Sequence, residues 1–333
     1  MIVRIARAIT VLLLPALCGV FVPPMGPSAP IARWIGDHCV AADGALTVRP
    51  GGHRVSGYFG NLTALGLAEA GDTPGALLGW LRWYVAHAQG TRDGVPDDVT
   101  LAPNGRVAAR QRPDSTDAYG ATFLMVAWRV LQGEDSSPRR FILKHRAAVE
   151  RIALSVLATQ QADGLTWARP NHPVAYAIDN AQVYRGLLDG ASLVDEAYKD
   201  RDLSRLLVRD ADRVRRGMLR DEWDIHTQSF RPFVGTGRPD SYPSADLTVA
   251  YPDALAQVAA VLYDIIPSKS PLAENLLERA RPALDYGTPT SRTFEFRLMY
   301  LAAREQIGKR INPMPFSPPN LCSDAGWELF LYR

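Results

Sequence analysis

The sequence predicts an all-α fold in which helical hairpins follow one another around a ring. Apolar residues recur at three- and four-residue spacing in eleven segments, which is the period of amphipathic helices. Gly, Pro, Asp and Ser stand at the breaks between these segments. The connections alternate between short and long, as stacked hairpins would require if every long loop lay on one face.

The eleven expected helices share this apolar spacing. In chain order they span residues 31–42, 58–70, 74–88, 115–131, 138–161, 177–197, 203–219, 244–265, 271–284, 291–306 and 323–332. Few strands are expected, and the clearest is a short hairpin-like piece within residues 223–233.

Helices that follow long loops are richer in apolar and small residues than those that follow short ones. Residues 118–130 and 181–191 show this pattern, and a helix that is apolar nearly all round is buried. The stretch 139–146 follows a short connection and carries five basic residues. We therefore expect an inner ring of apolar helices and an outer layer of charged ones.

Residues 1–30 have the features of a secretory signal. Arg4 and Arg7 precede an apolar run over residues 8–22, and small residues and prolines follow it. The run is shorter than the ~20 apolar residues of a membrane span. An uncleaved N-terminal anchor is the alternative, and it would be the only expected membrane contact. Residues 31–333 would then form one domain of a periplasmic or secreted protein.

Two cysteines, Cys39 and Cys322, lie outside the expected signal segment. In an oxidising compartment they would pair as a disulfide, whereas the alternative is two separate buried thiols. A bridge between them would join the two ends of the domain, which a closed ring of helices would bring together.

Composition excludes several classes of function. Hydrophobic content of 47% and charged content of 22% are ordinary for a globular protein. The formal charge is +2, and the basic residues are scattered among acidic ones, so the sequence predicts no nucleic-acid partner. The six histidines lack metal-ligand spacing, and there is no phosphate-binding glycine loop. No metal and no cofactor are expected.

A polar motif opens the expected helix at residues 115–131. Asp114 or Ser115 could cap this helix, because a short oxygen-bearing side chain accepts hydrogen bonds from its free amide groups. Asp117 lies in the first turn, where the helix dipole favours negative charge. Polar residues recur at the starts of later inner helices, which is more than capping alone requires.

Three stretches and the hairpin cycle together resemble the six-hairpin glycosidase superfamily, the (α/α)6 toroids. The stretches are Tyr-Phe-Gly-Asn-Leu at 58–62, Asp-Ser-Thr-Asp-Ala-Tyr at 114–119, and Asp-Gly-Leu-Thr-Trp at 163–167 leading to 178–184. The resemblance spans residues 31–333. It implies a carbohydrate ligand, with reactive carboxylates and sugar-stacking aromatic residues at the starts of inner helices and in the loops before them.

Glycoside hydrolysis usually requires two carboxyl groups that flank the scissile bond. Asp117 and Asp179 lie one hairpin cycle apart, so a ring would place them equivalently on neighbouring inner helices. We predict that they form the acid/base pair; the alternative is that each only caps its helix. Glu295 is a further expected substrate-binding residue, although it could instead form an ion pair with Arg292 or Arg297.

The remaining expected substrate-binding residues lie in or beside the long loops and at helix starts. Aromatic rings offer sugars an apolar face and a polar edge, although some of these rings would only anchor loops. The residues are Tyr58, Asp114, Tyr119, Trp167, Asn180, Trp223, Tyr242 and Asp246.

The sequence therefore predicts an exported glycoside hydrolase that acts on a polysaccharide or oligosaccharide. One alternative is a polysaccharide lyase or epimerase on the same ring, which would use Tyr119, Tyr176 or His172. The other is a non-catalytic glycan-binding or polysaccharide-export protein that has kept the ring without the chemistry.

Overall fold

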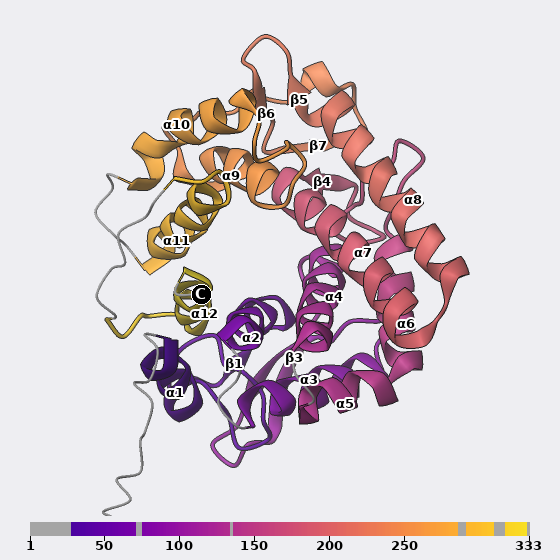
Figure 1. The fold of residues 1–333 in the computed structure, drawn as a ribbon, viewed down its shortest axis with the longest axis vertical. Helices are drawn as coiled ribbons and strands as arrows, with labels where there is room; N and C mark the ends of the chain where they lie inside the picture. The colour runs from indigo at the N-terminus through magenta and orange to yellow at the C-terminus, as the bar shows by residue number, and fades with distance from the viewer. Residues whose placement is uncertain (1–27, 71–74, 134–135, 286–290, 310–316, 332–333) are drawn as a thin grey trace, which may run out of the picture.

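The computed structural model describes residues 28–70, 75–133, 136–285, 291–309 and 317–331. Its helices form a ring, which confirms the predicted all-α toroid (Figure 1). The inner helices each pack against the next, and the last packs against the first. They are α2 (Gly57–Ala70), α4 (Thr116–Gln132), α7 (Ala177–Tyr198), α9 (Leu255–Leu262), α11 (Ser291–Gln306) and α12 (Cys322–Leu331).

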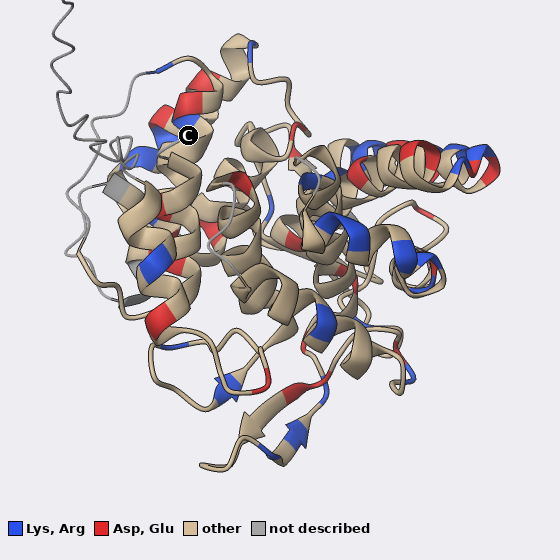
Figure 2. Cartoon of the chain, turned by 60° about the horizontal axis from the view of Figure 1, so that its bottom comes forward, with Lys and Arg blue, Asp and Glu red and all other residues tan. Residues whose placement is uncertain are grey.

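The outer helices surround this inner ring (Figure 1). They are α1 (Ser28–His38), α3 (Ala76–Ala88), α5 (Ser137–Lys144), α6 (Arg146–Leu157), α8 (Arg201–Gly217) and α10 (Pro271–Asp285). Figure 2 shows basic and acidic segments interspersed over the chain, including a long outer helix that carries both signs. Among the described helices, none combines the length and apolar character needed to cross a bilayer.

Short antiparallel strands stiffen the long loops before the inner helices. β1 (Arg54–Val55), β2 (Asp98–Leu101) and β3 (Val107–Gln111) form one sheet. β4 (Val174–Tyr176) pairs with β7 (Phe233–Gly235). β5 (Trp223–Asp224) pairs with β6 (Ser229–Phe230), which confirms the expected hairpin. These pairings fix the backbone close to where α2, α4 and α7 begin.

Three helix boundaries differ from those expected. The segment at 138–161 is two helices that meet at His145, whose φ of −104° and ψ of 36° interrupt the helix. The segment at 244–265 begins only with a π-helical turn at Ala250–Ala254. Tyr251 precedes a proline, which disfavours the α conformation, and its φ and ψ are −132° and 132°. The first helix begins at Ser28, within the expected signal segment, whose residues 1–27 lie outside the described part.

Two close contacts join the ends of the ring. The predicted disulfide is present between Cys39, just after α1, and Cys322, the first residue of α12, with their Cα atoms 5.9 Å apart. Further along the same junction, a Cβ on Gly66 of α2 would lie 2.1 Å from the carbonyl oxygen of Gly326 on α12. Glycine is therefore required where these two helices touch.

The disulfide closes a loop with a sequence separation of 283, so it should strongly restrict the unfolded chain. We expect the Cys39→Ser, Cys322→Ser double variant to lose about 2–5 kcal/mol of unfolding free energy. Chemical denaturation with and without reductant measures this. Reductant should destabilise the wild type and leave the double variant unchanged; equal stability of the two oxidised proteins would contradict this role.

Candidate active site

The candidate site lies at the ring centre, on the face where the inner helices begin, and a serine there bridges two aspartates. Ser115 immediately precedes α4 and has extended backbone angles, with φ of −144° and ψ of 92°. Its Oγ lies 2.7 Å from Oδ1 of Asp117 and 2.5 Å from Oδ2 of Asp179. The structure thus joins the two aspartates expected as a pair, through a third side chain.

The Ser115 hydroxyl has a single hydrogen, so it can donate to only one of the two carboxyl groups. The other short contact becomes a hydrogen bond when that carboxyl group is itself protonated and donates to Ser115 Oγ. Both contacts are hydrogen bonds when the trio holds one proton more than two ionised aspartates would. Which aspartate keeps this proton follows from their surroundings.

The surroundings of Asp117 favour the ionised form of its carboxyl group. It is completely buried, and its carboxyl group accepts hydrogen bonds from Thr166 Oγ1 at 2.7 Å and from the amide of Ala118 at 2.8 Å, besides the contact with Ser115. Burial raises the pKa of Asp117, whereas these hydrogen bonds lower it. They stabilise the charged form inside the protein.

The surroundings of Asp179 favour the protonated form of its carboxyl group. It is half-buried in the first turn of α7, and Ser115 is its one hydrogen-bond partner among the described residues. Burial, followed by the nearby charge of Asp117, raises the pKa of Asp179 well above its ordinary value. Asp179 is therefore a carboxyl group whose protonated form is favoured, and it is partly accessible to solvent.

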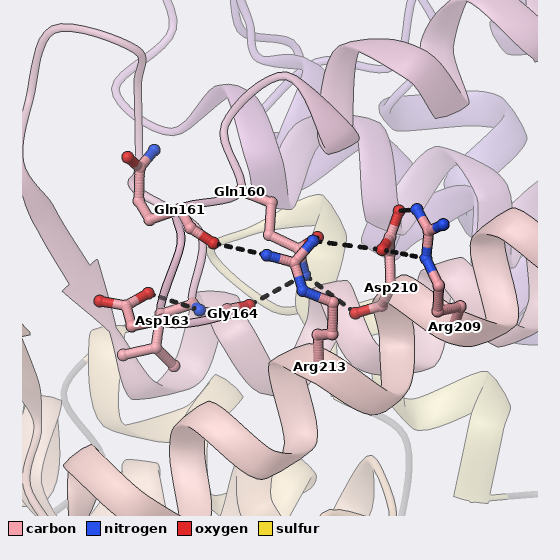
Figure 3. Close-up of polar contacts among 8 residues, drawn as sticks. Gln160, Gln161, Asp163, Gly164, Arg209, Asp210 and Arg213 are labelled. Atoms are coloured by element: carbon pink, nitrogen blue, oxygen red, sulfur yellow. Dashed lines mark hydrogen bonds and ion pairs between the residues drawn. The ribbon is translucent and has the colours of Figure 1, made fainter.

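Thr166 comes from the loop between α6 and β4, which Asn180 holds in place. Asn180 Oδ1 accepts from the Thr166 amide at 2.8 Å, and Asn180 Nδ2 donates to the Thr166 carbonyl at 3.1 Å. On the outer side, Arg213 of α8 donates to the side chain of Gln160 and the carbonyl of Gln161 (Figure 3). Gly164, with φ of +97°, lies so close that a Cβ would be 2.4 Å from the Arg213 carbonyl oxygen.

A second group of carboxyls lies on α11 and α12. Glu295, Asp324 and Glu328 are buried. Burial raises the pKa of Glu295 to about 7, although the Trp327 side chain lowers it in part. Burial and the charge of Glu295 raise the pKa of Asp324 to about 8, and burial raises the pKa of Glu328 to about 7. Neither carboxyl oxygen of Asp324 has a hydrogen-bond partner among the described residues.

The Tyr58 hydroxyl is influenced electrostatically by a carboxyl of each group. Its hydroxyl accepts a hydrogen bond from Gln182 Nε2 at 2.8 Å, and Gln182 Nε2 also lies 3.3 Å from the hydroxyl of Tyr263. Burial raises the pKa of Tyr58, and the charges of Tyr263, Glu295 and Asp179 raise it further. Asp179 and Glu295 thus both lie near one half-buried tyrosine, on α7 and α11 respectively.

The other expected site residues separate into buried supports and exposed side chains. Tyr119 is 2% exposed and donates to Asp98 Oδ1, and Asn180 is fully buried. Trp167, Trp223 and Tyr242 are partly exposed in the loops, whereas Asp114 and Asp246 are exposed. Asp246 lies before the π-helical turn rather than inside a helix.

Glu222, Asp324 and Glu328 are among the buried carboxyls that sequence reasoning missed. Glu222 is fully buried, neither of its carboxyl oxygens has a hydrogen-bond partner in the described structure, and burial raises its pKa well above the ordinary value. Asp324 and Glu328 share a helix face at four-residue spacing, a signal that also fits an exposed surface. Within the described residues, no group of histidine, cysteine and acidic side chains could hold a metal ion.

The raised carboxyl pKa values predict how stability depends on pH. The unfolded chain ionises Glu295 near pH 4.5 and the folded protein only near pH 7, so its contribution to stability falls as pH rises through this interval. Glu295→Gln should remove about 3 kcal/mol of this decline between pH 4.5 and 8. Unfolding free energies measured across that range, with the exposed Glu196→Gln as control, check it; identical pH slopes in both variants would refute it.

The sequence matches no known family model and no curated protein. Solved structures match over nearly the whole chain. A structure titled "Glycosidase Wild Type" has 13% identity and a TM-score of 0.64 over 91% of this chain and 94% of its own. A second structure, "Glycosidase E335A in complex with glucose", has 14% identity and a TM-score of 0.58, again over 91% of this chain and 94% of its own.

Two further matches come from named bacteria. A Klebsiella oxytoca rhamnosidase with rhamnose bound has 16% identity and a TM-score of 0.58 over 92% of this chain and 64% of its own. A double mutant of Rex8A from Paenibacillus barcinonensis has 11% identity and a TM-score of 0.53 over 89% and 86%. At such identities the likeness establishes the architecture, and the chain has the (α/α)6 fold of the six-hairpin glycosidases.

Proposed function

We propose that the protein is a glycoside hydrolase that cleaves a polysaccharide or oligosaccharide at the ring centre, on the face with the long loops. The observation that supports this most is the placement of two carboxyl groups with raised pKa, Asp179 and Glu295, near Tyr58. Glycosidases require one carboxyl group that donates a proton and one that assists water or attacks the sugar. The glycosidase neighbours share this ring.

In the proposed reaction, Asp179 donates its proton to the glycosidic oxygen as the bond from that oxygen to the anomeric carbon breaks. Ionised Glu295 accepts a proton from water while the water oxygen bonds to the anomeric carbon. Asp117 is fully buried, so it acts through Ser115 and holds the proton on Asp179 rather than contacting the sugar. Ser115 and Asp117 are thus positioning residues.

The two ionisations set an expected pH profile. Glu295 must be ionised, and its pKa is raised to about 7, so activity should increase as pH rises through neutrality. Asp179 must stay protonated, so activity should fall at higher pH, where Asp179 loses its proton. A carboxyl group of ordinary pKa could not act as the acid under these conditions.

The environment of the tyrosines disfavours the lyase alternative. Tyr119 is 2% exposed, and burial and the charge of Asp98 raise its pKa, so its hydroxyl keeps its proton and donates it to Asp98. Burial likewise raises the pKa of Tyr176. Neither phenol is set up to remove a proton from a sugar acid.

We also propose that the protein is exported, on the basis of the signal-like residues 1–30 and the Cys39–Cys322 disulfide. N-terminal sequencing of protein recovered from the periplasm or the medium tests this. A mature chain that begins after the apolar run supports export with cleavage, whereas recovery only from the cytoplasm contradicts it.

Reducing-end release from a panel of bacterial and plant polysaccharides tests the catalytic assignment. Asp179→Asn should lower turnover by about 10²–10⁴-fold, because it removes the proton donor. Ser115→Ala should cause a smaller loss, since Asp179 keeps its proton but loses the hydrogen bond that orients it. Asp202→Asn, at an exposed position on α8, is the matched control.

Turnover that survives in folded Asp179→Asn would refute the assignment. An absence of release from every substrate, together with measurable glycan binding, would refute hydrolysis and favour the glycan-binding alternative.

A further inference from the structure

A cavity of about 320 Å³ lies at the end of the ring opposite the candidate active site. Every inner helix contributes to its wall from the second half of its length. One contributor from each is Leu65, Met125, Asp189, Leu262, Glu305 and Trp327. Because the aspartate pair lies at the helix starts, this space, here called the rear cavity, is distinct from the candidate active site.

We propose that the rear cavity binds one neutral sugar or a similar polyol, independently of hydrolysis at the other face. Its volume is at the small end of the range for small-molecule sites, which suits a single ring rather than a long oligosaccharide. Partly exposed Phe330 supplies aromatic surface for the apolar face of a sugar, and the buried Trp327 and Tyr263 line the cavity behind it.

Charged side chains in the wall form ion pairs with one another. Arg185 Nη2 lies 2.7 Å from Asp189 Oδ1, and Arg185 Nη1 lies 3.5 Å from Asp264 Oδ2. Gln306 Nε2 donates to Asp264 Oδ1 at 2.8 Å. The guanidinium charge is thus already matched by carboxylates, so a charged ligand gains less here than a neutral one with several hydroxyls. Such a preorganised polar wall favours hydrogen bonds to hydroxyl groups.

One buried polar atom in the wall indicates a ligand rather than simple packing. Glu305 Oε2 is buried and has no hydrogen-bond partner among the described residues, which is costly for a carboxylate unless a donor occupies the space. Asp264 also lines the cavity, and its φ of 62° is the left-handed conformation that ends α9. A sugar hydroxyl would satisfy Glu305 by donating to it.

Two aromatic side chains contact both the rear cavity and residues near the candidate active site. Tyr263 lines the rear cavity while its hydroxyl lies beside Gln182, and Trp327 lines it while its indole influences the pKa of Glu295. Substituting either would therefore disturb both sites. Glu305 and Gln306, at the end of α11, line the rear cavity alone and are the better test positions.

The experiment is a crystal soak of Asp179→Asn with D-glucose and, separately, with L-rhamnose, followed by calorimetric titration of the same sugars. We expect electron density for one sugar ring against Phe330, within hydrogen-bonding distance of Glu305. Glu305→Ala should weaken the affinity of this site about tenfold, the effect of one hydrogen bond to a charged group. Glu196→Ala, an exposed glutamate on α7, should leave it unchanged.

Density confined to the opposite face, or only water in the rear cavity, would overturn the proposal. Equal affinities in the two glutamate variants would also overturn it. If Glu305→Ala fails to fold, the affinity comparison uses Gln306→Met instead. The crystal soak of Asp179→Asn still shows whether a sugar occupies the rear cavity. The readout does not require turnover, so a failure of the proposed hydrolysis leaves this test intact.

Discussion

Closure of the inner ring between α12 and α2 is the constraint on which the rest of the structure depends. Gly66 and Gly326 allow the two helices to touch, and the Cys39–Cys322 disulfide joins the chain at the same junction. Once the ring is closed, the starts of all six inner helices face one end. Polar residues in their first turns then converge on the axis, although they are far apart in sequence.

This convergence has a physical cost. Buried carboxyl groups destabilise the folded state when they are ionised, and the ring centre gathers several with few hydrogen-bond partners. A purely structural core would replace such groups with apolar ones. Asp179, Glu295 and Asp324 instead have pKa values raised by burial, which is the arrangement expected where an active site lowers stability.

Much of the fold could be predicted from the sequence because helix periodicity is local and loop lengths report connectivity. The disulfide followed from there being two cysteines at the domain ends. The bridging role of Ser115 could not be predicted, because it depends on the angle between α4 and α7. Asp324 and Glu328 were missed because acidic residues spaced four apart in a short last helix also suit an exposed face, and only ring closure buries them.

The central claim is that Asp179 keeps a proton at neutral pH because it is buried beside ionised Asp117. A ¹³C NMR titration of aspartate carboxyl carbons, in the wild type and in Asp179→Asn, tests this most directly. The account predicts a carboxyl signal that titrates well above the ordinary aspartate value of about 3.9 and is absent from the variant. If every aspartate signal lost in the variant titrates near the ordinary value, Asp179 is not the proton donor.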